Sequence, residues 1–213
     1  MQRLPAEYPA VSIPRRIVFA SGNRGKLREV KRLLEGFGVD VLPQSDFDVE
    51  EAAETGTTFL ENSLIKSRNA AKATGLPAIA DDSGLAVDAL GGAPGVYSAR
   101  YSGPGATDAR NIDKLLAELE GVPDSERGAA FHCVASFVDP ASGDELVGEG
   151  AWCGRILTAR QGEGGFGYDP VFFDDARGKS AAEFGADEKN AASHRGQALR
   201  ALLTALEARY RQT

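Results

Sequence analysis

Pro77-Ala78-Ile79-Ala80-Asp81-Asp82-Ser83-Gly84 is a short apolar run that ends in two adjacent carboxylates, a hydroxyl and a glycine. The pattern predicts a buried strand whose C-terminal end carries charged side chains. This end of the strand is the expected place for chemistry. Because neighbouring residues on a strand point to opposite faces, Asp81 and Asp82 share one pocket only if the chain turns, and Ser83-Gly84 suits such a turn. One carboxylate is then available for a hard cation and the other to orient water or backbone. A plain polar turn is the alternative interpretation.

Length and composition limit the class of protein. The chain has 213 residues, is 42% hydrophobic and carries a formal net charge of −7. A chain of this size forms one full core, divided at most into two lobes over a cleft, so we expect a single domain over residues 17–213. The acidic balance disfavours a nucleic-acid partner held by general phosphate attraction, so phosphate recognition must be local. Residues 1–16 contain Pro5, Pro9 and Pro14 without apolar periodicity, and we expect an irregular extension there.

Cysteine usage and hydropathy indicate the compartment. Cys133 and Cys153 do not have the spacing of metal ligands. No segment of the sequence has the apolar length of a membrane span or the pattern of a secretory signal. We therefore expect a reduced, cytoplasmic protein with no membrane partner.

The first apolar run, residues 17–20, is followed by Ser21-Gly22-Asn23-Arg24-Gly25-Lys26 and by apolar residues at helical spacing. This order predicts a strand, a loop and a helix. A glycine-bearing loop that opens a helix offers backbone N–H groups and the positive end of the helix dipole to an anion, and Lys26 adds a charge. The arrangement suits a polyphosphate, although an ordinary strand-to-helix turn is the alternative. The loop is not a P-loop, because the longer gap that a P-loop has before its Gly-Lys pair is absent.

Residues 57 to about 73 predict a helix that begins with a capping box and ends at a Gly-Leu-Pro stop. Asn62, Lys66 and Asn69 share one face of this helix. Such a face is usually solvated, but the helix leads through a short turn into the aspartate strand, which brings Lys66 near the same cleft. Upstream, Glu54 belongs to an acidic cluster and is a candidate second carboxylate for a metal.

The rest of the chain adds a hairpin and structural helices. Apolar residues alternate with other residues between 129 and 157, around a turn at 139–144, which predicts an antiparallel hairpin and therefore a mixed sheet. A helix that begins near Asp108 carries a core-facing stripe and is expected to be purely structural.

Residues 162–170, Gly-Glu-Gly-Gly-Phe-Gly-Tyr-Asp-Pro, combine four glycines with two aromatics. The glycines let the backbone approach a flat ligand closely while a ring stacks on it, which suits a nucleobase; a turn whose aromatics pack in the core is the alternative. Lys189 precedes a strongly amphipathic terminal helix that starts with His194 and Arg195. Cations are unfavourable at a helix start, so an anionic or electron-rich group is expected beside them.

Together these motifs resemble the inosine/xanthosine triphosphate pyrophosphatases, a family that removes deaminated purine nucleotides. The resemblance implies a mixed α/β fold with an elongated, twisted sheet flanked by helices, two lobes around a central nucleotide-binding cleft, and a homodimer. It also implies Mg²⁺-dependent cleavage of ITP, dITP and XTP to the monophosphate and diphosphate, before they are incorporated into DNA or RNA. The similar stretches occur in the same order as in the family, namely Ser21–Lys26, Phe59–Lys66, Ala80–Gly84, Gly91–Gly103, Gly164–Pro170 and Ser193–Gly196.

The resemblance implies a role for each matching residue. Asp82 would bind Mg²⁺ or activate water with support from Asp81, and Lys66 would add charge at the reacting phosphorus. Members often have two consecutive glutamates before Thr-Gly, where this chain has Ala53-Glu54, and Glu54 is the expected second metal ligand. The substrate-binding residues implied are Ser21, Gly22, Asn23, Arg24, Gly25 and Lys26 for the triphosphate, and Ser83, Phe166, Gly167, Tyr168, Asp169, Lys189, His194 and Arg195 for the nucleoside.

The chemistry of the reaction matches these residue types. Water that attacks the α-phosphorus faces a highly anionic substrate, so Mg²⁺, Lys26 and Lys66 must neutralise charge while a carboxylate takes the proton. Two other classes stay open at this point. A nucleotide-binding sensor would bind the same ligand without releasing diphosphate, and a phosphomonoesterase would release orthophosphate.

Overall fold

The computed structural model describes residues 13–210 and confirms a mixed α/β fold. Residues 1–12, most of the predicted extension, lie outside the described residues, and the first strand begins at Arg16. The helices are α1 (Arg24–Leu34), α2 (Phe59–Thr74), α3 (Asp108–Glu118), α4 (Ala186–Ala192) and α5 (His194–Tyr210). The strands are β1 (Arg16–Phe19), β2 (Asp40–Pro43), β3 (Ala78–Val87), β4 (Gly128–Val138), β5 (Glu145–Ile156), β6 (Phe172–Asp174) and β7 (Lys179–Ser180).

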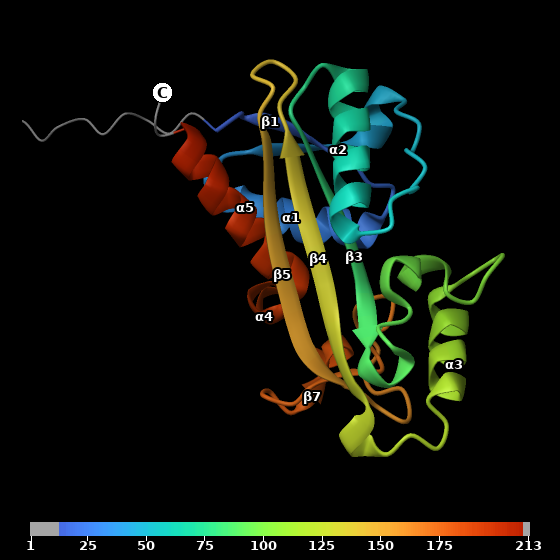
Figure 1. Ribbon diagram of the computed structural model, residues 1–213. Coiled ribbons are helices and arrows are strands. Elements are labelled where there is room, and N and C mark those ends of the chain that lie inside the picture. Colours follow the sequence, from blue (N-terminus) through green and yellow to red (C-terminus); the bar gives the residue numbers. More distant parts are fainter. Residues whose placement is uncertain (1–12, 211–213) are drawn as a thin grey trace, which may run out of the picture.

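Within the described residues one seven-stranded sheet forms, in the order β2-β1-β3-β4-β5-β6-β7. β1 is parallel to β2 and β3, and the other neighbouring strands are antiparallel, so the predicted hairpin of β4 and β5 is confirmed. Figure 1 shows β4 and β5 running the length of the molecule, with α2 beside their upper half and α3 near their lower half. None of the helices within residues 13–210 is both long and apolar enough to cross a lipid bilayer.

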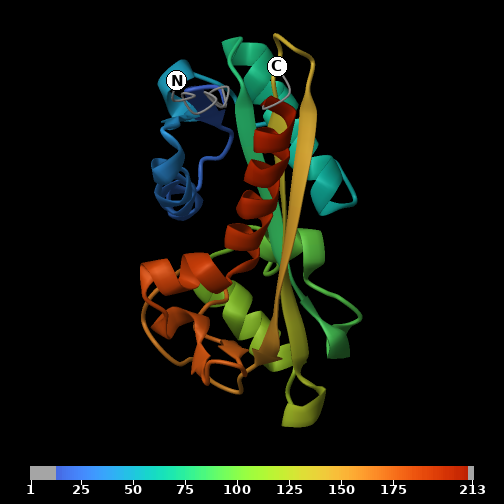
Figure 2. The ribbon, with the colours of Figure 1, turned by 90° about the vertical axis from the view of Figure 1, so that its left-hand side faces the viewer.

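Two lobes share the long strands β3, β4 and β5. The upper lobe consists of β1, β2, α1 and α2, and the lower lobe consists of residues 88–127 and 157–192. Figure 2 shows α5 along the upper half of the sheet, while α4 lies with the lower lobe. The lobes correspond to the bilobed arrangement that the family resemblance implies.

Two hydrophobic clusters on the α5 side of the sheet leave a polar band between them. The upper cluster includes Phe137 and Leu199 and reaches β3 at Ile79, whereas the lower cluster includes Trp152 and reaches β3 at Leu85. Because side chains two residues apart on a strand share a face, Asp81 and Ser83 lie on this face between the two clusters. The cores of the two lobes therefore place polar residues of β3 where the lobes meet.

The course of β3 corrects the prediction for the central aspartates. The sequence predicts a strand that ends at Asp81 and turns at Ser83-Gly84, but β3 stays paired with β4 from Ala78 to Val87 without interruption. Asp81 and Asp82 therefore point to opposite faces of the sheet. Gly84 serves close packing and not a turn, because a Cβ atom there would collide with the carbonyl of Gly95.

Along the edge of β3 that faces β1, strand pairing ends after the first two residues of β3. The short β1 pairs with β3 only at Ala78 and Ile79, and the last link is the hydrogen bond from the Ala20 N–H to the Ile79 carbonyl at 2.8 Å. Further along, the Leu85 N–H donates to Ser98 Oγ at 2.9 Å. Between these links no described strand pairs with this edge. Groups from both faces of the sheet can therefore meet beside Asp81 and Asp82.

Candidate active site

The loop between β1 and α1 is pre-formed by its own side chains. Asn23 is the N-cap of α1, and its Oδ1 accepts hydrogen bonds from the N–H groups of Gly25 at 2.8 Å and Lys26 at 3.1 Å. Ser21, Gly22 and Asn23 line a cavity, so the positive end of the α1 dipole faces it. This is the geometry that the sequence predicts for an anion-binding loop.

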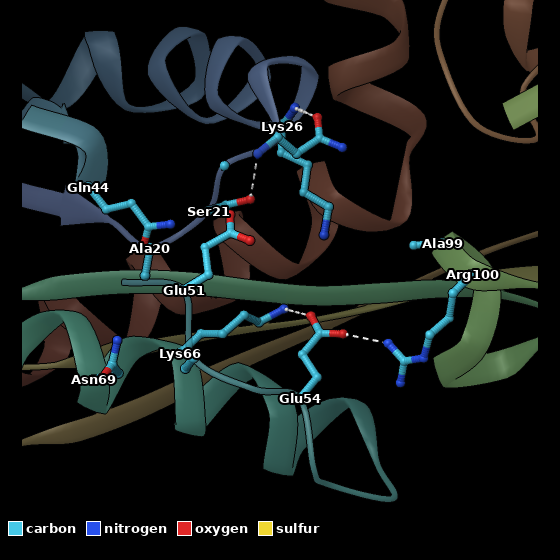
Figure 3. A pocket seen from close by; sticks show the side chains of 13 residues that line it. Ala20, Ser21, Lys26, Gln44, Glu51, Glu54, Lys66, Asn69, Ala99 and Arg100 are labelled. Carbon is cyan, nitrogen blue, oxygen red and sulfur yellow. Dashed lines mark hydrogen bonds and ion pairs between the residues drawn. The ribbon is translucent and has the colours of Figure 1, made fainter. Parts of the chain in front are cut away.

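The cavity over this loop is lined mainly by the upper lobe, with Ala99 and Arg100 contributed by the lower lobe, and has a volume of ≈ 620 Å³. Figure 3 shows side chains from the loop, from the segment before α2, from α2 and from the 3-10 helix Gly95–Arg100 around one space. We call this space the upper cavity. Its polar and charged lining residues are Ser21, Asn23, Lys26, Gln44, Glu51, Glu54, Lys66, Asn69 and Arg100.

Lys66 bridges two carboxylates at the floor of the cleft. Its Nζ lies 2.9 Å from Glu54 Oε1 and 2.9 Å from Asp82 Oδ1, and its side chain is 13% exposed. Burial alone would lower the pKa of Lys66, but Asp82, Asp81 and Glu54 raise it, so the ammonium group stays charged. The polar face of α2 is therefore turned to the cleft, and the interpretation of Lys66 as a solvated residue is wrong.

A second residue of α2 binds the other carboxylate oxygen of Asp82. The Asn62 side-chain amide donates to Asp82 Oδ2 at 3.3 Å, while Asn62 Oδ1 accepts from the Gly56 N–H at 2.8 Å. Burial raises the pKa of Asp82, against the opposing attraction of Lys66 and Lys26. A carboxylate whose pKa is raised is a better proton acceptor at neutral pH. Asn62 was found by its spacing from Lys66, but the sequence assigned it no role.

Asp81 lies beneath the cleft and contacts its cations from the opposite face. Its Oδ2 lies 3.0 Å from Lys26 Nζ and 3.1 Å from Arg195 Nε, and its side chain is fully buried. Burial would raise the pKa of Asp81, but Lys26, Arg195 and Lys66 hold it well below its usual range. Asp81 lines neither the upper cavity nor the cavity described next, and its ion pairs are with the cations Lys26 and Arg195.

The second cavity, of ≈ 150 Å³, lies toward the lower lobe and is called here the lower cavity. The ring of Phe166 covers two cations there, with Lys189 Nζ 4.7 Å and Arg195 Cζ 5.6 Å from its centroid. Lys189 Nζ also lies 2.5 Å from Asp169 Oδ2, which accepts from the Phe166 N–H at 2.8 Å. The Gly-rich loop thus holds its aromatic ring over positive charge, where a flat ligand can take part in stacking.

Arg195 and His194 occupy the start of α5 for different reasons. Arg195 donates to Ser83 Oγ at 3.0 Å and is paired with both Asp81 and Glu29, which provides the anionic partners expected beside a cation at a helix start. His194 is 5% exposed and stacks on Phe131 at 4.7 Å, and its Nδ1 has no hydrogen-bond partner within residues 13–210. Burial, together with Arg195 and Lys189, lowers the pKa of His194 well below its ordinary value, so the ring is neutral at pH 7.

The two cavities form one cleft, because Asn23, Lys26 and Glu54 line both of them. Most of the predicted substrate-binding residues border this cleft, including Ser83, Gly167 and Asp169 at the lower end. Arg24 and Gly25 do not line either cavity. Tyr168 borders the lower cavity but is 4% exposed and packs in the lower hydrophobic cluster, and its hydroxyl donates to the Ser98 carbonyl at 2.8 Å.

Several supporting residues have no clear sequence signal. The N-terminus of α3 is not purely structural, because Asp108 Oδ2 accepts from the Gly167 N–H at 2.7 Å and fixes the aromatic loop. Glu29 on α1 lies 3.4 Å from Lys189 and also pairs with Arg195, so it joins the helix of the phosphate loop to the lower cavity. These partners are far apart in the sequence, and local patterns carry no information about them.

The donor set fits a divalent cation that is bound largely by its substrate. Glu54 and Asp82 already surround one positive charge, the Lys66 ammonium, and both offer carboxylate oxygens. Mg²⁺ prefers oxygen ligands and is often held by one or two carboxylates together with substrate phosphates. No group of three or more His, Cys, Asp or Glu side chains that could hold a metal occurs in the described part of the chain. A cation made secure by phosphate oxygens agrees with this arrangement.

Comparison with known proteins places this geometry in a family. The dITP/XTP pyrophosphatases of Shigella flexneri and Escherichia coli O157:H7 are 58% and 57% identical over 192 residues, which are 90% of this chain and 98% of each relative. Solved structures of Ham1 proteins from Coxiella burnetii and Staphylococcus aureus match with TM-scores of 0.82 and 0.80, at 49% and 41% identity. They cover 91% of this chain, and the match covers 98% and 99% of theirs. A model of the Ham1 family matches residues 17–205, which include both ends of the cleft, and the chain therefore belongs to the Ham1 family.

Proposed function

We propose that this protein hydrolyses deaminated purine nucleoside triphosphates, ITP, dITP and XTP, to the monophosphate and diphosphate. The observation that carries the proposal is the continuous cleft, with an anion-binding loop at one end, an aromatic and cationic pocket at the other, and Asp82 between them. Relatives that are 57–58% identical to this chain are named dITP/XTP pyrophosphatases, which supports dITP and XTP as substrates. Such an enzyme removes these nucleotides from the pool before they enter DNA or RNA.

The reaction proceeds by attack of water on the α-phosphorus. Asp82 takes a proton from the attacking water, the new oxygen–phosphorus bond forms, and the bond from the α-phosphorus to the bridging oxygen breaks. The diphosphate leaves with the bonding electron pair. Lys26 and Lys66 neutralise the charge that develops on the phosphoryl oxygens, and Asn62 keeps Asp82 oriented for the proton transfer.

We propose that Mg²⁺ is the cofactor, with Asp82 and Glu54 as its protein ligands. When bound, the ion supplies Lewis-acid stabilisation of negative charge on the phosphates. Glu54 is suited to this position because Lys66 at 2.9 Å and Arg100 at 3.0 Å hold its carboxylate toward the cleft. Although burial opposes ionisation, Lys66 and Arg100 lower the pKa of Glu54, so it stays available as an anionic ligand.

Base selection follows from the donors at the lower end of the cleft. Hypoxanthine and xanthine present an acceptor oxygen at C6, whereas adenine presents an amino donor there. The lower cavity is bordered by Lys189, His194 and Arg195. The 6-amino group of adenine, a donor, would therefore meet other donors there and find no acceptor. A buried donor left without an acceptor costs about 1–3 kcal/mol, which disfavours ATP. Guanine shares the C6 oxygen, and we attribute its rejection to the ring of Phe166, which offers no acceptor to the 2-amino group.

We also propose a homodimer in the cytoplasm. The homodimer is supported by the face of β5 on the α2 side, where Ala151 and Cys153 are exposed and Val147 is 36% exposed. A second copy of the chain is suited to cover such a sheet face. Light scattering during size exclusion tests the dimer, and Val147→Glu should shift the mass toward the monomer.

One assay tests the proposed reaction. The protein is incubated with ITP in the presence and absence of Mg²⁺, and diphosphate is separated from orthophosphate; ATP and GTP serve as matched substrates. We expect diphosphate and IMP from ITP in the presence of Mg²⁺. Release of orthophosphate would instead indicate a phosphomonoesterase, and binding without either product would indicate a nucleotide sensor.

A further inference from the structure

The upper cavity extends past the catalytic residues, away from the base pocket. α2 leads through a tight turn into β3, so the helix and the strand run in opposite directions. Asn69 therefore lies about one helical turn beyond Lys66, in the direction away from Ser83. Gln44 borders the cavity at this far end, near Ala20 and Ser21 (Figure 3). The known elements of the site leave this end of the cavity without an assigned ligand.

Gln44 is an unusual residue in this position. It begins the 3-10 helix Gln44–Phe47 directly after β2, and it is 7% exposed. Its side-chain amide extends toward Ala20 and Ser21 (Figure 3), and no hydrogen bond joins it to another residue within 13–210. Its amide atoms are not among the fully buried side-chain atoms that lack a hydrogen-bond partner, so the amide opens into the cavity while the rest of the side chain is buried. The amide is therefore held at the cavity wall and is available to a ligand there.

The side-chain amide of Asn69, which borders the same cavity, has a hydrogen-bond partner in the protein. Asn69 Nδ2 donates to the Glu50 carbonyl at 2.9 Å, which ties the segment before α2 to the helix. Glu51 on that segment lies against the phosphate loop, since a Cβ atom at Gly22 would collide with its carboxylate. Asn69 uses one of its two amide N–H groups in the bond to Glu50, whereas neither amide N–H group of Gln44 has a partner within residues 13–210.

The direction of a bound nucleotide identifies that anion. Ser83 and Gly84 on β3 border the base end, and Asp82 with Lys66 marks the reacting α-phosphorus. A triphosphate chain that continues from this point along β3 runs toward Ala20, beside which Gln44 borders the cavity (Figure 3). We propose that the Gln44 amide donates to the terminal phosphate of the substrate, and so makes the site prefer nucleoside triphosphates over diphosphates. This inference rests on the proposed function of the cleft.

The proposal predicts a difference between two substrates in one variant. Gln44→Leu keeps the volume of the side chain and removes its donor. We expect kcat/KM for ITP to fall about tenfold to a hundredfold, the range for a lost hydrogen bond to a charged group, while IMP formation from inosine diphosphate changes by less than about twofold. Inosine diphosphate is the internal control, because it lacks the terminal group. The affinity for inorganic diphosphate, measured by calorimetry with Mg²⁺, should weaken by the same factor as kcat/KM for ITP.

The outcomes separate this inference from the proposed function. Equal loss for ITP and inosine diphosphate, or unchanged diphosphate affinity in Gln44→Leu, would overturn the role of Gln44. If the parent protein does not release diphosphate from ITP, the proposed function fails, while the diphosphate affinities of the parent and the variant still test the contact. Removal of an amide that has no protein partner within residues 13–210 should leave the melting temperature nearly unchanged. If Gln44→Leu does not fold, Gln44→Met makes the same comparison.

Discussion

Asp81 and Asp82 are neighbours on β3, but their carboxylates lie on opposite faces of the sheet and pair with different lysines. Asp81 Oδ2 lies 3.0 Å from Lys26 Nζ, and Asp82 Oδ1 lies 2.9 Å from Lys66 Nζ. Since β1 leaves the edge of β3 open at this point, the two ammonium groups reach one cleft from the two faces. Positive charge therefore lies on both sides of the cleft, and the Asp81-Asp82 dipeptide holds both cations.

The first prediction concerns Asp82. Asp82→Asn removes a proton acceptor and a metal-ligand charge but hardly changes the volume, so turnover of ITP should fall by more than the 10²–10⁴-fold typical of a general base. Nucleotide binding should persist, because the phosphate loop and the lower cavity are unchanged. Steady-state kinetics and calorimetric binding of ITP measure the two effects. Near-parental turnover at saturating Mg²⁺ would show that Asp82 has been misassigned.

The second prediction concerns the stability provided by Lys66. The sequence suggests an exposed helical lysine whose replacement by alanine hardly changes the melting temperature. In the structure Lys66 separates two partly buried carboxylates, so Lys66→Ala removes the cation paired with Asp82 and leaves Glu54 with Arg100 alone. Breaking a buried ion pair costs about 3–5 kcal/mol, and we expect a drop of about 6 °C or more in melting temperature together with lower turnover.

A double variant tests the cause of that loss. Adding Glu54→Gln to Lys66→Ala removes one of the two carboxylates that Lys66 neutralised, so the repulsion between Glu54 and Asp82 ends and part of the lost stability should return. Activity should not return, because the cation beside the reacting phosphorus is still missing. Thermal unfolding of the four proteins in the cycle provides the comparison, and strictly additive losses would contradict the proposed charge interaction.

The third prediction concerns base selection. His194→Phe removes the free ring nitrogen and keeps an aromatic ring on Phe131. We expect kcat/KM for ITP to fall about tenfold or more, while the value for ATP changes little, so that the preference for ITP narrows. Arg195→Ala is the matched comparison. Since Arg195 is paired with Asp81 and Glu29, its loss should reduce activity on both substrates and lower the melting temperature.

The fourth prediction is a pH dependence of stability that originates at His194. The folded state holds the pKa of His194 well below its ordinary value, so the unfolded chain binds a proton at a higher pH than the folded protein does. Above about pH 6.5 both states are neutral and stability does not depend on this group. Below that pH the unfolded state is favoured, by up to about 1.4 kcal/mol for each pH unit.

Melting temperatures between pH 7.5 and pH 5.5 measure this dependence. His194→Phe should flatten the decline on the acidic side, whereas His132→Gln, which changes the other histidine, should leave it in place. An equally steep decline in His194→Phe would assign the pH dependence to other groups.

The sequence predicts best the parts of the site that local interactions build. The capping box of Thr58 and Glu61 and the αL stop at Gly75 delimit α2, and both are present in the structure. The anion-binding loop is equally local, because Asn23 caps α1 through residues only two and three positions away. Patterns of this kind depend on the spacing of nearby residues along the chain, and a single sequence shows that spacing completely.

The errors arise where distant segments stabilise what a local pattern disfavours. Two carboxylates look like the end of a buried strand, because burying an unpaired charge is costly. Here Lys26, Lys66 and Arg195 arrive from three different helices and compensate that cost, so β3 continues through Asp81 and Asp82. Gln44, Glu29 and Asp108 acquire their roles in the same way, and no spacing rule connects them to the cleft.

The division of the cleft between two lobes has a consequence for the stability of the whole chain. Lys66 belongs to the upper lobe, Phe166 and Lys189 belong to the lower lobe, and the long strands β3, β4 and β5 are the structure that the two lobes share. A nucleoside triphosphate bound in the proposed way would contact both lobes only when the protein is folded, and would so act as a reversible cross-link between them. Inorganic diphosphate would occupy the upper cavity, whose lining comes from the upper lobe except for Ala99 and Arg100. In hydrogen exchange, the nucleotide should therefore slow the opening of both lobes together, while diphosphate protects the amides of one lobe and leaves the other to open as before.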